Sequence, residues 1–277
     1  MYKAEETILK IENLSVGYED KNGNMKMILK DVNFSEQDII RDGIAATGQT
    51  IAFIGRSGRG KSTLFKALTG LLQPTTGDIC ITNFATEDKT DLKKVVEGDI
   101  GFVDQKYTLF RHKTVEQICK YALRKIKISK SEKANLIDTY LNDWGLSEHR
   151  KKYSCELSGG QRQRAAIIEQ MLTSKHFMIF DEPFSGLDVG NIEKVKESFN
   201  KILNTDEYNT IIFSTHDIRL AAELADSIYI VGFPEGKTDY STIIKHYDLK
   251  QMGLAWTPYG DGHRRLVSEI KELLLKS

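Results

Sequence analysis

The sequence predicts an α/β fold with a buried sheet, preceded by antiparallel strands and interrupted by a helical segment. Short apolar or mixed strands recur along the chain, separated by longer polar and helical stretches. The amino-terminal part instead alternates apolar and polar residues. Between Thr114 and Trp144 the apolar spacing becomes helical. These three patterns predict a mixed architecture in one chain of 277 residues.

The amino-terminal strands are expected at residues 8–18, ILKIENLSVGY, and 25–34, MKMILKDVNF. The turn-forming run at 21–24, KNGN, separates them and favours an antiparallel pair. Further strands, most of them in the buried sheet, are expected at 50–55 (TIAFIG), 80–83 (CITN), 99–104 (DIGFVD), 176–181 (HFMIFD), 210–215 (TIIFST) and 227–232 (SIYIVG).

The helical insert is expected to begin at a capping box formed by Thr114 and Gln117. One helical face of this insert carries Ala134, Ile137, Leu141 and Trp144, and Gly145 ends it. From Pro234 onward the chain ends in an amphipathic pattern, which predicts a helix packing on the core through Leu266, Ile270, Leu273 and Leu274. We therefore divide the chain into residues 1–233, with a helical subdomain at about 106–172, and an extension at 234–277.

Charge and cysteine usage exclude several classes of function. Lysines and arginines number 39 and are balanced by 39 acidic residues, so no sequence-wide field would recruit nucleic acid. The three cysteines, Cys80, Cys119 and Cys155, form no C-x-x-C pair and have no metal-ligand spacing. Any anion site must therefore be local.

A phosphate-binding loop is predicted by Gly55-x-x-x-x-Gly60-Lys61-Ser62, which follows an apolar strand and precedes an apolar helix. In this motif the glycines let the backbone wrap around a phosphate, the lysine reaches the β and γ oxygens, and the serine hydroxyl binds Mg²⁺. The expected nucleotide contacts are Gly55, Arg56, Ser57, Gly58, Arg59, Gly60, Lys61, Ser62 and Thr63. For the two arginines, exposed and solvated side chains are the alternative.

Polar residues follow three other predicted strands. Asp181 suits Mg²⁺ and Glu182 suits polarising an attacking water, although an Asp-Glu pair after a strand is also typical of a turn. His216 can reach a γ-phosphate, or it can be a packed core histidine. Gln105 can sense the metal and the water, or it can be a surface amide.

The stretch CELSGGQ, residues 155–161, places Ser158, Gly159 and Gly160 at the entrance of a predicted helix from Arg162 to about Leu172. Bare amides at the positive end of a helix dipole suit a phosphate. An ordinary N-cap is the alternative for this stretch.

Taken together, these motifs resemble the ATP-binding cassette (ABC) ATPases. The resemblance rests on GRSGRGKST, the glutamine of FVDQ, LSGGQRQR, FMIFDEP, SGLD and STHD, in the family's order, and it covers about residues 8–232. It implies a P-loop NTPase core with an N-terminal antiparallel β subdomain and a helical signature subdomain. It also implies ATP and Mg²⁺ as cofactors.

The resemblance implies a role for each motif. Tyr18 would stack on adenine, and Ser62, Gln105 and Asp181 would hold the metal. Glu182, His216 and Lys61 would be catalytic. Residues Ser158, Gly159, Gly160 and Gln161, with Asp188, would close on ATP held by a second protomer, so the complete site would exist only in a head-to-tail dimer.

Two functions remain open at this point. The favoured one is the ATPase subunit of a transporter, peripheral on the cytoplasmic face of the membrane, with separate transmembrane permease subunits and a solute-binding protein as partners. The competing one is a cassette that acts on a soluble partner in assembly, repair or defence. Tyr107, Leu109 and Phe110 would form an apolar cleft for a membrane partner, or they would be core.

The segment TLFRHKTVEQ and the tail resemble importers of nitrate, sulfonates and related anions. Residues 35–47 exceed the family's usual connection and would lengthen the hairpin.

Overall fold

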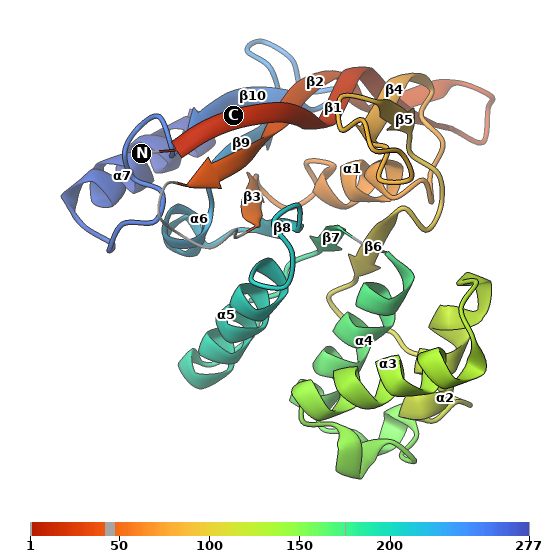
Figure 1. The fold of residues 1–277 in the computed structure, drawn as a ribbon. Helices are drawn as coiled ribbons and strands as arrows, with labels where there is room; N and C mark the ends of the chain where they lie inside the picture. The colour runs from red at the N-terminus through yellow and green to blue at the C-terminus, as the bar shows by residue number, and fades with distance from the viewer. Residues whose placement is uncertain (1, 42–47, 175, 277) are drawn as a thin grey trace.

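The computed structural model describes residues 2–41, 48–174 and 176–276. Two sheets and a group of helices make up this part of the chain (Figure 1). The larger sheet has six strands, in the spatial order β10 (Thr242–Asp248), β9 (Ser227–Gly232), β3 (Gln49–Ile54), β8 (Thr210–Thr215), β7 (Phe177–Phe180) and β6 (Ile100–Val103). All neighbours in it are parallel except β10, which runs antiparallel to β9.

The smaller sheet is antiparallel and lies along the top of the view in Figure 1. Its order is β2 (Met25–Arg41), β1 (Tyr2–Glu19), β4 (Thr76–Thr82) and β5 (Leu92–Lys94). The predicted hairpin is confirmed and is longer than expected, because Tyr2 pairs with Arg41 at its far end. The expected strand at 80–83 belongs to this sheet and not to the parallel one. The remainder of the predicted insertion, residues 42–47, lies outside the described residues.

The hydrophobic core lies on both faces of the parallel sheet. Within β3, Ala52 and Ile54 pack into one apolar cluster, and Ile51 and Phe53 pack into the other. Successive side chains of a strand point to opposite faces, so a strand buried on both sides is apolar throughout. This explains why the run TIAFIG shows no alternation.

Some helices lie beside the sheets, and others form the lower lobe in Figure 1. Helix α1 (Lys61–Leu68) packs between the two sheets through Leu64, Phe65 and Leu68. The lobe contains α2 (Val115–Ala122), α3 (Lys130–Asp143) and α4 (Gly159–Thr173), with short 3₁₀ turns at Leu123–Lys125, Ser147–His149 and Ser154–Glu156. The other helices are α5 (Val189–Leu203), α6 (Ile218–Leu224) and α7 (Asp261–Lys276).

The predicted capping box of Thr114 and Gln117 is present at the start of α2. A second box, formed by Ser129 and Glu132, begins α3, so the insert contains two helices where a single pattern was expected. The prediction for Ala134 was wrong, because this residue is exposed whereas Ile137, Leu141 and Trp144 are buried. The helix turns by about 100° per residue, and the small alanine lies at the edge of the apolar face.

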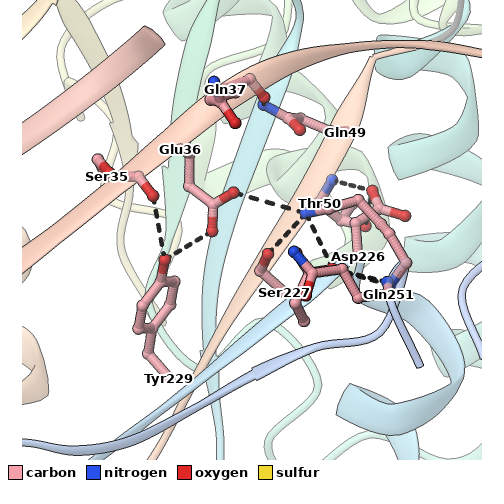
Figure 2. A network of polar contacts seen from close by, with 11 residues as sticks. Ser35, Glu36, Gln37, Gln49, Thr50, Asp226, Ser227, Tyr229 and Gln251 are labelled. Atoms are coloured by element: carbon pink, nitrogen blue, oxygen red, sulfur yellow. Dashed lines mark hydrogen bonds and ion pairs between the residues drawn. The ribbon is translucent and has the colours of Figure 1, made fainter. Parts of the chain in front are cut away.

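The carboxyl-terminal segment is tied to the rest of the fold. Strand β10 extends the parallel sheet, and α7 packs beside α6, with Leu266 and Ile270 buried as expected. A polar contact joins this segment to the long hairpin, because Lys250 Nζ lies 3.6 Å from Glu36 Oε2. The same carboxylate accepts the hydroxyl proton of Tyr229, on β9, at Oε1 over 2.8 Å (Figure 2). Lys250 Nζ also donates to Ser227 Oγ. The division of the chain at residue 233 stays a prediction.

Candidate functional site

The phosphate loop lies between β3 and α1. Gly55 contacts the end of β9 so closely that a Cβ atom there would be 2.4 Å from the carbonyl oxygen of Val231, which explains why this position requires glycine. Gly60, the residue before α1, has a φ of 84°, in the left-handed region that favours glycine. The loop therefore turns tightly and directs the amino end of an eight-residue helix at the space above it.

Lys61 is almost completely buried at the floor of this loop. Its ammonium group donates to the carbonyl oxygen of Gly55 over 2.7 Å and lies 3.6 Å from Oε1 of Glu182. A buried ammonium group needs hydrogen-bond acceptors and a counter-charge, and these two neighbours provide both. A phosphate that enters the loop would replace them as the partner of Lys61.

The acidic residues and the histidine come together because β7 and β8 are parallel neighbours. Asp181 and Glu182 follow β7, His216 follows β8, and the carboxyl ends of parallel strands meet at one edge of the sheet. His216 Nδ1 lies 3.0 Å from Glu182 Oε2. The Glu182 carboxylate is thus held between an ammonium group and an imidazole.

Ser214 is a functional candidate that the sequence reasoning did not single out. It lies at the end of β8, is fully buried, donates its hydroxyl proton to Asp181 Oδ1 over 2.7 Å and accepts the N–H of Glu182 over 2.8 Å. The sequence did contain one indication of this role: in IIFSTHD, Ser214 lies two residues before His216, and residues two apart in a strand point to the same face.

The loop that carries Gln105 is shaped by its neighbours. The Asp104 carboxylate accepts hydrogen bonds from the N–H of Thr108 (2.9 Å) and from its hydroxyl (2.6 Å). The hydroxyl of Tyr107 donates to the carbonyl oxygen of Pro183, which links this loop to the one after β7. Gln105 itself is exposed and borders the pocket that contains the phosphate loop.

One pocket of about 570 Å³ brings most of the predicted site residues together. Its lining is formed by Tyr18, Ile28, Ser57, Gly58, Arg59, Gly60, Lys61, Ser62, Thr63, Gln105, Asp181, Glu182, Ser185 and His216. Tyr18 is 45% exposed, so its ring is available to a planar ligand. Ile28 and Ser185 were not predicted and join the lining from β2 and from the loop after β7.

The arginines of the phosphate loop differ in their surroundings. The Arg59 guanidinium lies over the ring of Phe233, 3.8 Å from its centre, whereas Arg56 is exposed. Neither Gly55 nor Arg56 lines the pocket, and each instead offers Lys61 a backbone carbonyl oxygen. Gly55 contributes as a backbone element, and Arg56 is free to contact solvent or a ligand.

The signature residues lie outside this pocket. Ser158 caps α4: its hydroxyl accepts the N–H of Gln161, and the Gln161 side chain accepts the N–H of Ser158 over 3.0 Å. Gly159 and Gly160 border a different hollow, between α4 and α5. Asp188 caps α5 and accepts the N–H of Asn191. Within a single chain, Ser158 and Asp188 are therefore N-caps, and none of these signature residues lines the pocket of the phosphate loop.

Oxygen donors for a magnesium ion are present at the pocket, although no cluster of three acidic, histidine or cysteine side chains suited to a metal occurs in the described ranges. The donors are the Ser62 hydroxyl and the Asp181 carboxylate. Mg²⁺ is typically bound by one or two carboxylates together with substrate phosphates, so this sparse set fits the ion when a nucleotide supplies the rest.

Comparisons with known proteins agree with this geometry. A family profile described as ABC transporter matches residues 43–185. The chain belongs to the ABC transporter family. As a member, it resembles the sulfate/thiosulfate import ATP-binding protein CysA of Thermosynechococcus vestitus, with 36% identity over 67% of this chain and 54% of that protein. CysA of Mycobacterium tuberculosis is 36% identical over 69% of this chain and 53% of that protein. The chain spans about half the length of these ABC relatives.

Solved structures of ABC family members show the same fold. The structure of cbiO1 from Clostridium perfringens, part of the ABC transporter complex cbiONQ, has a TM-score of 0.66 and 26% identity, and the match covers 91% of this chain and 92% of that one. A dimeric post-hydrolysis state of an ATP-binding cassette bound to ADP and Pi has a TM-score of 0.65 and 26% identity, over 87% and 99%. The α/β fold with its P-loop core is therefore confirmed for this ABC family member.

Proposed function

We propose that this chain is the ATP-binding and ATP-hydrolysing subunit of an ABC transporter, and that ATP-dependent head-to-tail pairing of two cassettes drives solute movement through separate membrane subunits. The observation that carries the proposal is the Lys61–Glu182–His216 arrangement at the mouth of the phosphate loop. Family membership and the names of the relatives support it.

Phosphate binding falls to the loop and to Lys61. The amino end of α1 and the glycine-rich backbone present N–H groups to an anion, and Lys61 adds a charge that is already desolvated. Tyr18, at the edge of the same pocket, is the candidate for stacking on the base. Because Lys61 is paired with Glu182 here, phosphate binding would release that carboxylate toward the water it is to activate.

Water activation falls to Glu182. A carboxylate within hydrogen-bond reach of a water at the γ-phosphate can accept its proton, and His216 at 3.0 Å holds one carboxylate oxygen in place. His216 is 69% exposed toward solvent, so it can also donate to a phosphate oxygen. Gln105 lines the same pocket and can orient the same water.

Ser62 and Asp181 are the residues that would hold Mg²⁺, with Gln105 nearby. The ion would neutralise charge on the phosphate oxygens while the γ-phosphoryl group is transferred to water and ADP leaves. Among this chain's own groups, Asp181 is already oriented by the Ser214 hydroxyl.

A second cassette is proposed to complete the site. Ser158, Gly159, Gly160, Gln161 and Asp188 do not line the pocket of their own chain, and all five are at least partly exposed, so they are accessible to a partner. The amides at the start of α4 suit the γ-phosphate of ATP held by that partner. One structurally similar cassette was solved as a dimer.

Membrane subunits are the proposed partners beyond the dimer, and we expect peripheral attachment at the cytoplasmic face. No helix within the described ranges is long and apolar enough to cross a bilayer. The proposed docking surface follows Gln105, where Phe110 is 38% exposed and packs against Tyr121. Of the two alternatives left open for Leu109, core is the one that its packing supports, because Leu109 is 8% exposed and lies in the apolar cluster, so it is left out of the proposed surface.

The solute is proposed to be a small oxyanion, delivered by a solute-binding protein. This follows from the relatives named for sulfate and thiosulfate import and from the resemblance of residues 108–117 to importers of related anions. The balanced charge of the chain gives no reason to expect nucleic acid as a partner. A soluble partner in place of membrane subunits is the competing function.

A two-part experiment tests this proposal. The purified chain should hydrolyse ATP in the presence of Mg²⁺, and the Lys61→Ala variant should not. Tagged wild-type chain, isolated from detergent-solubilised membranes, should retain integral membrane subunits. Absence of hydrolysis would refute the enzymatic part, and recovery of soluble partners alone would favour the competing function.

A further inference from the structure

We propose that Ser214 is a positioning residue, whose hydroxyl orients the carboxylate of Asp181 and the backbone of Glu182 at the same time. The inference rests on the proposed function, because it assigns Asp181 to the metal and Glu182 to the attacking water. It concerns a residue of β8, a strand that carries neither carboxylate.

The geometry of Ser214 is that of a bridge between strands. In the parallel pairing of β7 with β8, Phe180 lies opposite Phe213, so Ser214 lies opposite Asp181 one step further along. Its oxygen donates to Asp181 Oδ1 over 2.7 Å and accepts the N–H of Glu182 over 2.8 Å. A hydroxyl has a single proton to donate, and here that proton is committed to Asp181.

The contact with Glu182 stabilises an unfavourable backbone conformation. Glu182 has a φ of 51°, in the left-handed region that is uncommon for residues other than glycine. Such conformations persist when the surroundings enforce them, and they occur often at functional sites. If the hydroxyl were absent, the N–H of Glu182 would lose its acceptor, and the turn could relax. The carboxylate would then move away from His216 and Lys61, which lie 3.0 and 3.6 Å from its oxygens.

The contact with Asp181 determines which of its oxygens remains available. Oδ1 accepts the Ser214 proton, whereas the structure assigns Oδ2 no hydrogen bond from any residue in the described ranges. Asp181 lines the pocket, so its second oxygen is the one available to a cation. A hydrogen bond to one carboxylate oxygen restricts the rotation of the group, which is how residues behind a metal ligand orient it.

The alternative is that Ser214 is an ordinary buried hydroxyl of the sheet. The chain contains a matched control for this on the same strand. Thr210 begins β8, is 1% exposed, and donates its hydroxyl to the carbonyl oxygen of Tyr208, at the end of the strand away from the pocket. Thr210→Val removes a buried hydroxyl from β8 without affecting either carboxylate.

The experiment compares Ser214→Ala, Ser214→Cys, Ser214→Thr and Thr210→Val with the wild type. Three quantities are measured: ATP turnover as a function of Mg²⁺, binding of trinitrophenyl-ATP with and without Mg²⁺, and thermal unfolding. Ser214→Ala should lower turnover and raise the half-saturating Mg²⁺ concentration by about 10- to 100-fold, the range typical of residues that orient metal ligands. Its binding of the nucleotide without Mg²⁺ should stay within about twofold of wild type, because the phosphate loop is intact.

The other variants give a graded control. Ser214→Thr retains the hydroxyl and should restore turnover to within about threefold of wild type, whereas Ser214→Cys, with a weak donor of similar size, should lie between Ala and Thr. Thr210→Val should behave as wild type in all three measurements. If Thr is too large for this buried position, thermal unfolding will show it, and Ala and Cys then decide the question.

Three results would overturn the inference. They are a Ser214→Ala variant with turnover and Mg²⁺ dependence near wild type, an equal loss in Thr210→Val, and a loss of nucleotide binding without Mg²⁺. A wild-type chain that hydrolyses no ATP would instead refute the proposed function. In that case the Mg²⁺-dependent part of nucleotide binding still decides whether Ser214 orients Asp181.

Discussion

The ammonium group of Lys61 lies 3.6 Å from the carboxylate of Glu182, so the lysine proposed to bind phosphate and the candidate general base form an ion pair. The two residues are 121 positions apart in the sequence, and the order β3, β8, β7 in the parallel sheet brings their strands close together. The pairing implies that each residue changes its partner when a nucleotide enters.

Glu182→Gln should separate binding from hydrolysis. The amide keeps the size of the side chain but cannot accept a proton from water, so turnover should fall by roughly 10²-fold or more. ATP should remain bound, and the variant should accumulate as an ATP-bound dimer. Gel filtration with ATP and Mg²⁺, together with a steady-state ATPase assay, measures both effects.

Lys61→Ala is the matched comparison, since it removes the other member of the pair. It should weaken ATP binding itself, because the phosphates lose their buried positive partner. Turnover near wild type in Glu182→Gln, or a purely monomeric elution with ATP, would contradict the role assigned to Glu182.

Mixing two inactive variants tests whether the site is shared between chains. Lys61→Ala disables a chain's own phosphate loop, and Ser158→Arg disables the α4 entrance that it presents to a partner. Each homodimer should be nearly inactive. In a heterodimer both lesions fall in one site and the other site is intact, so part of the ATPase activity should return.

The mixture requires proof of subunit exchange, which differently tagged chains and a pull-down provide. ATP-dependent dimer formation should be followed in parallel, because strong coupling between the sites could silence the intact one. No recovery in proven heterodimers with weak coupling would count against the two-chain site.

Phe110→Ser and Leu109→Ser should have different effects, although the residues are adjacent. Leu109 is core, so its replacement creates a cavity and buries a hydroxyl, and should lower the free energy of unfolding by about 2–5 kcal/mol. Phe110 is partly exposed, so its replacement should leave the unfolding temperature and nucleotide binding nearly unchanged but weaken recovery of the membrane subunits. Equal recovery in wild type and Phe110→Ser would exclude this surface as the dock.

The buried carboxyl group of Asp226 should make stability depend on pH. Burial raises its pKa to about 6 from the ordinary 3.8, against the opposing effects of the Thr50 N–H and of Lys250. The folded chain therefore binds this proton more tightly than the unfolded chain does. The contribution of Asp226 to the free energy of unfolding should fall as pH rises from about 4 through 6.

Asp226→Asn removes the titrating carboxyl group and with it this pH dependence. The free energy of unfolding of the variant, minus that of the wild type, should therefore increase as pH rises from about 4 through 6. Urea unfolding at pH 4, 5, 6 and 7 measures the difference, and Asp78→Asn, at an exposed position, controls for loss of a surface charge. A constant difference between wild type and Asp226→Asn would contradict the assignment.

Local features were predictable from the sequence because they depend on consecutive residues. The glycine spacing of 55–60, the strand before it and the helix after it define the phosphate loop within about twenty residues. The capping boxes of α2 and α4 depend on residues three positions apart, and the burial of Ile137, Leu141 and Trp144 depends on helical spacing. The positions after each strand indicated Asp181, Glu182 and His216.

Only the tertiary structure decided which side chains meet. Periodicity reports which face of an element is buried but not its neighbour, so the contacts of Ser214 with Asp181 and Glu182 could not be derived from spacing. The same holds for Glu36 and Lys250, 214 positions apart, which join the long hairpin to the carboxyl-terminal segment. Leu109 and Phe110 are both large and apolar, and only the packing of the helical lobe against the sheet buries one and exposes the other.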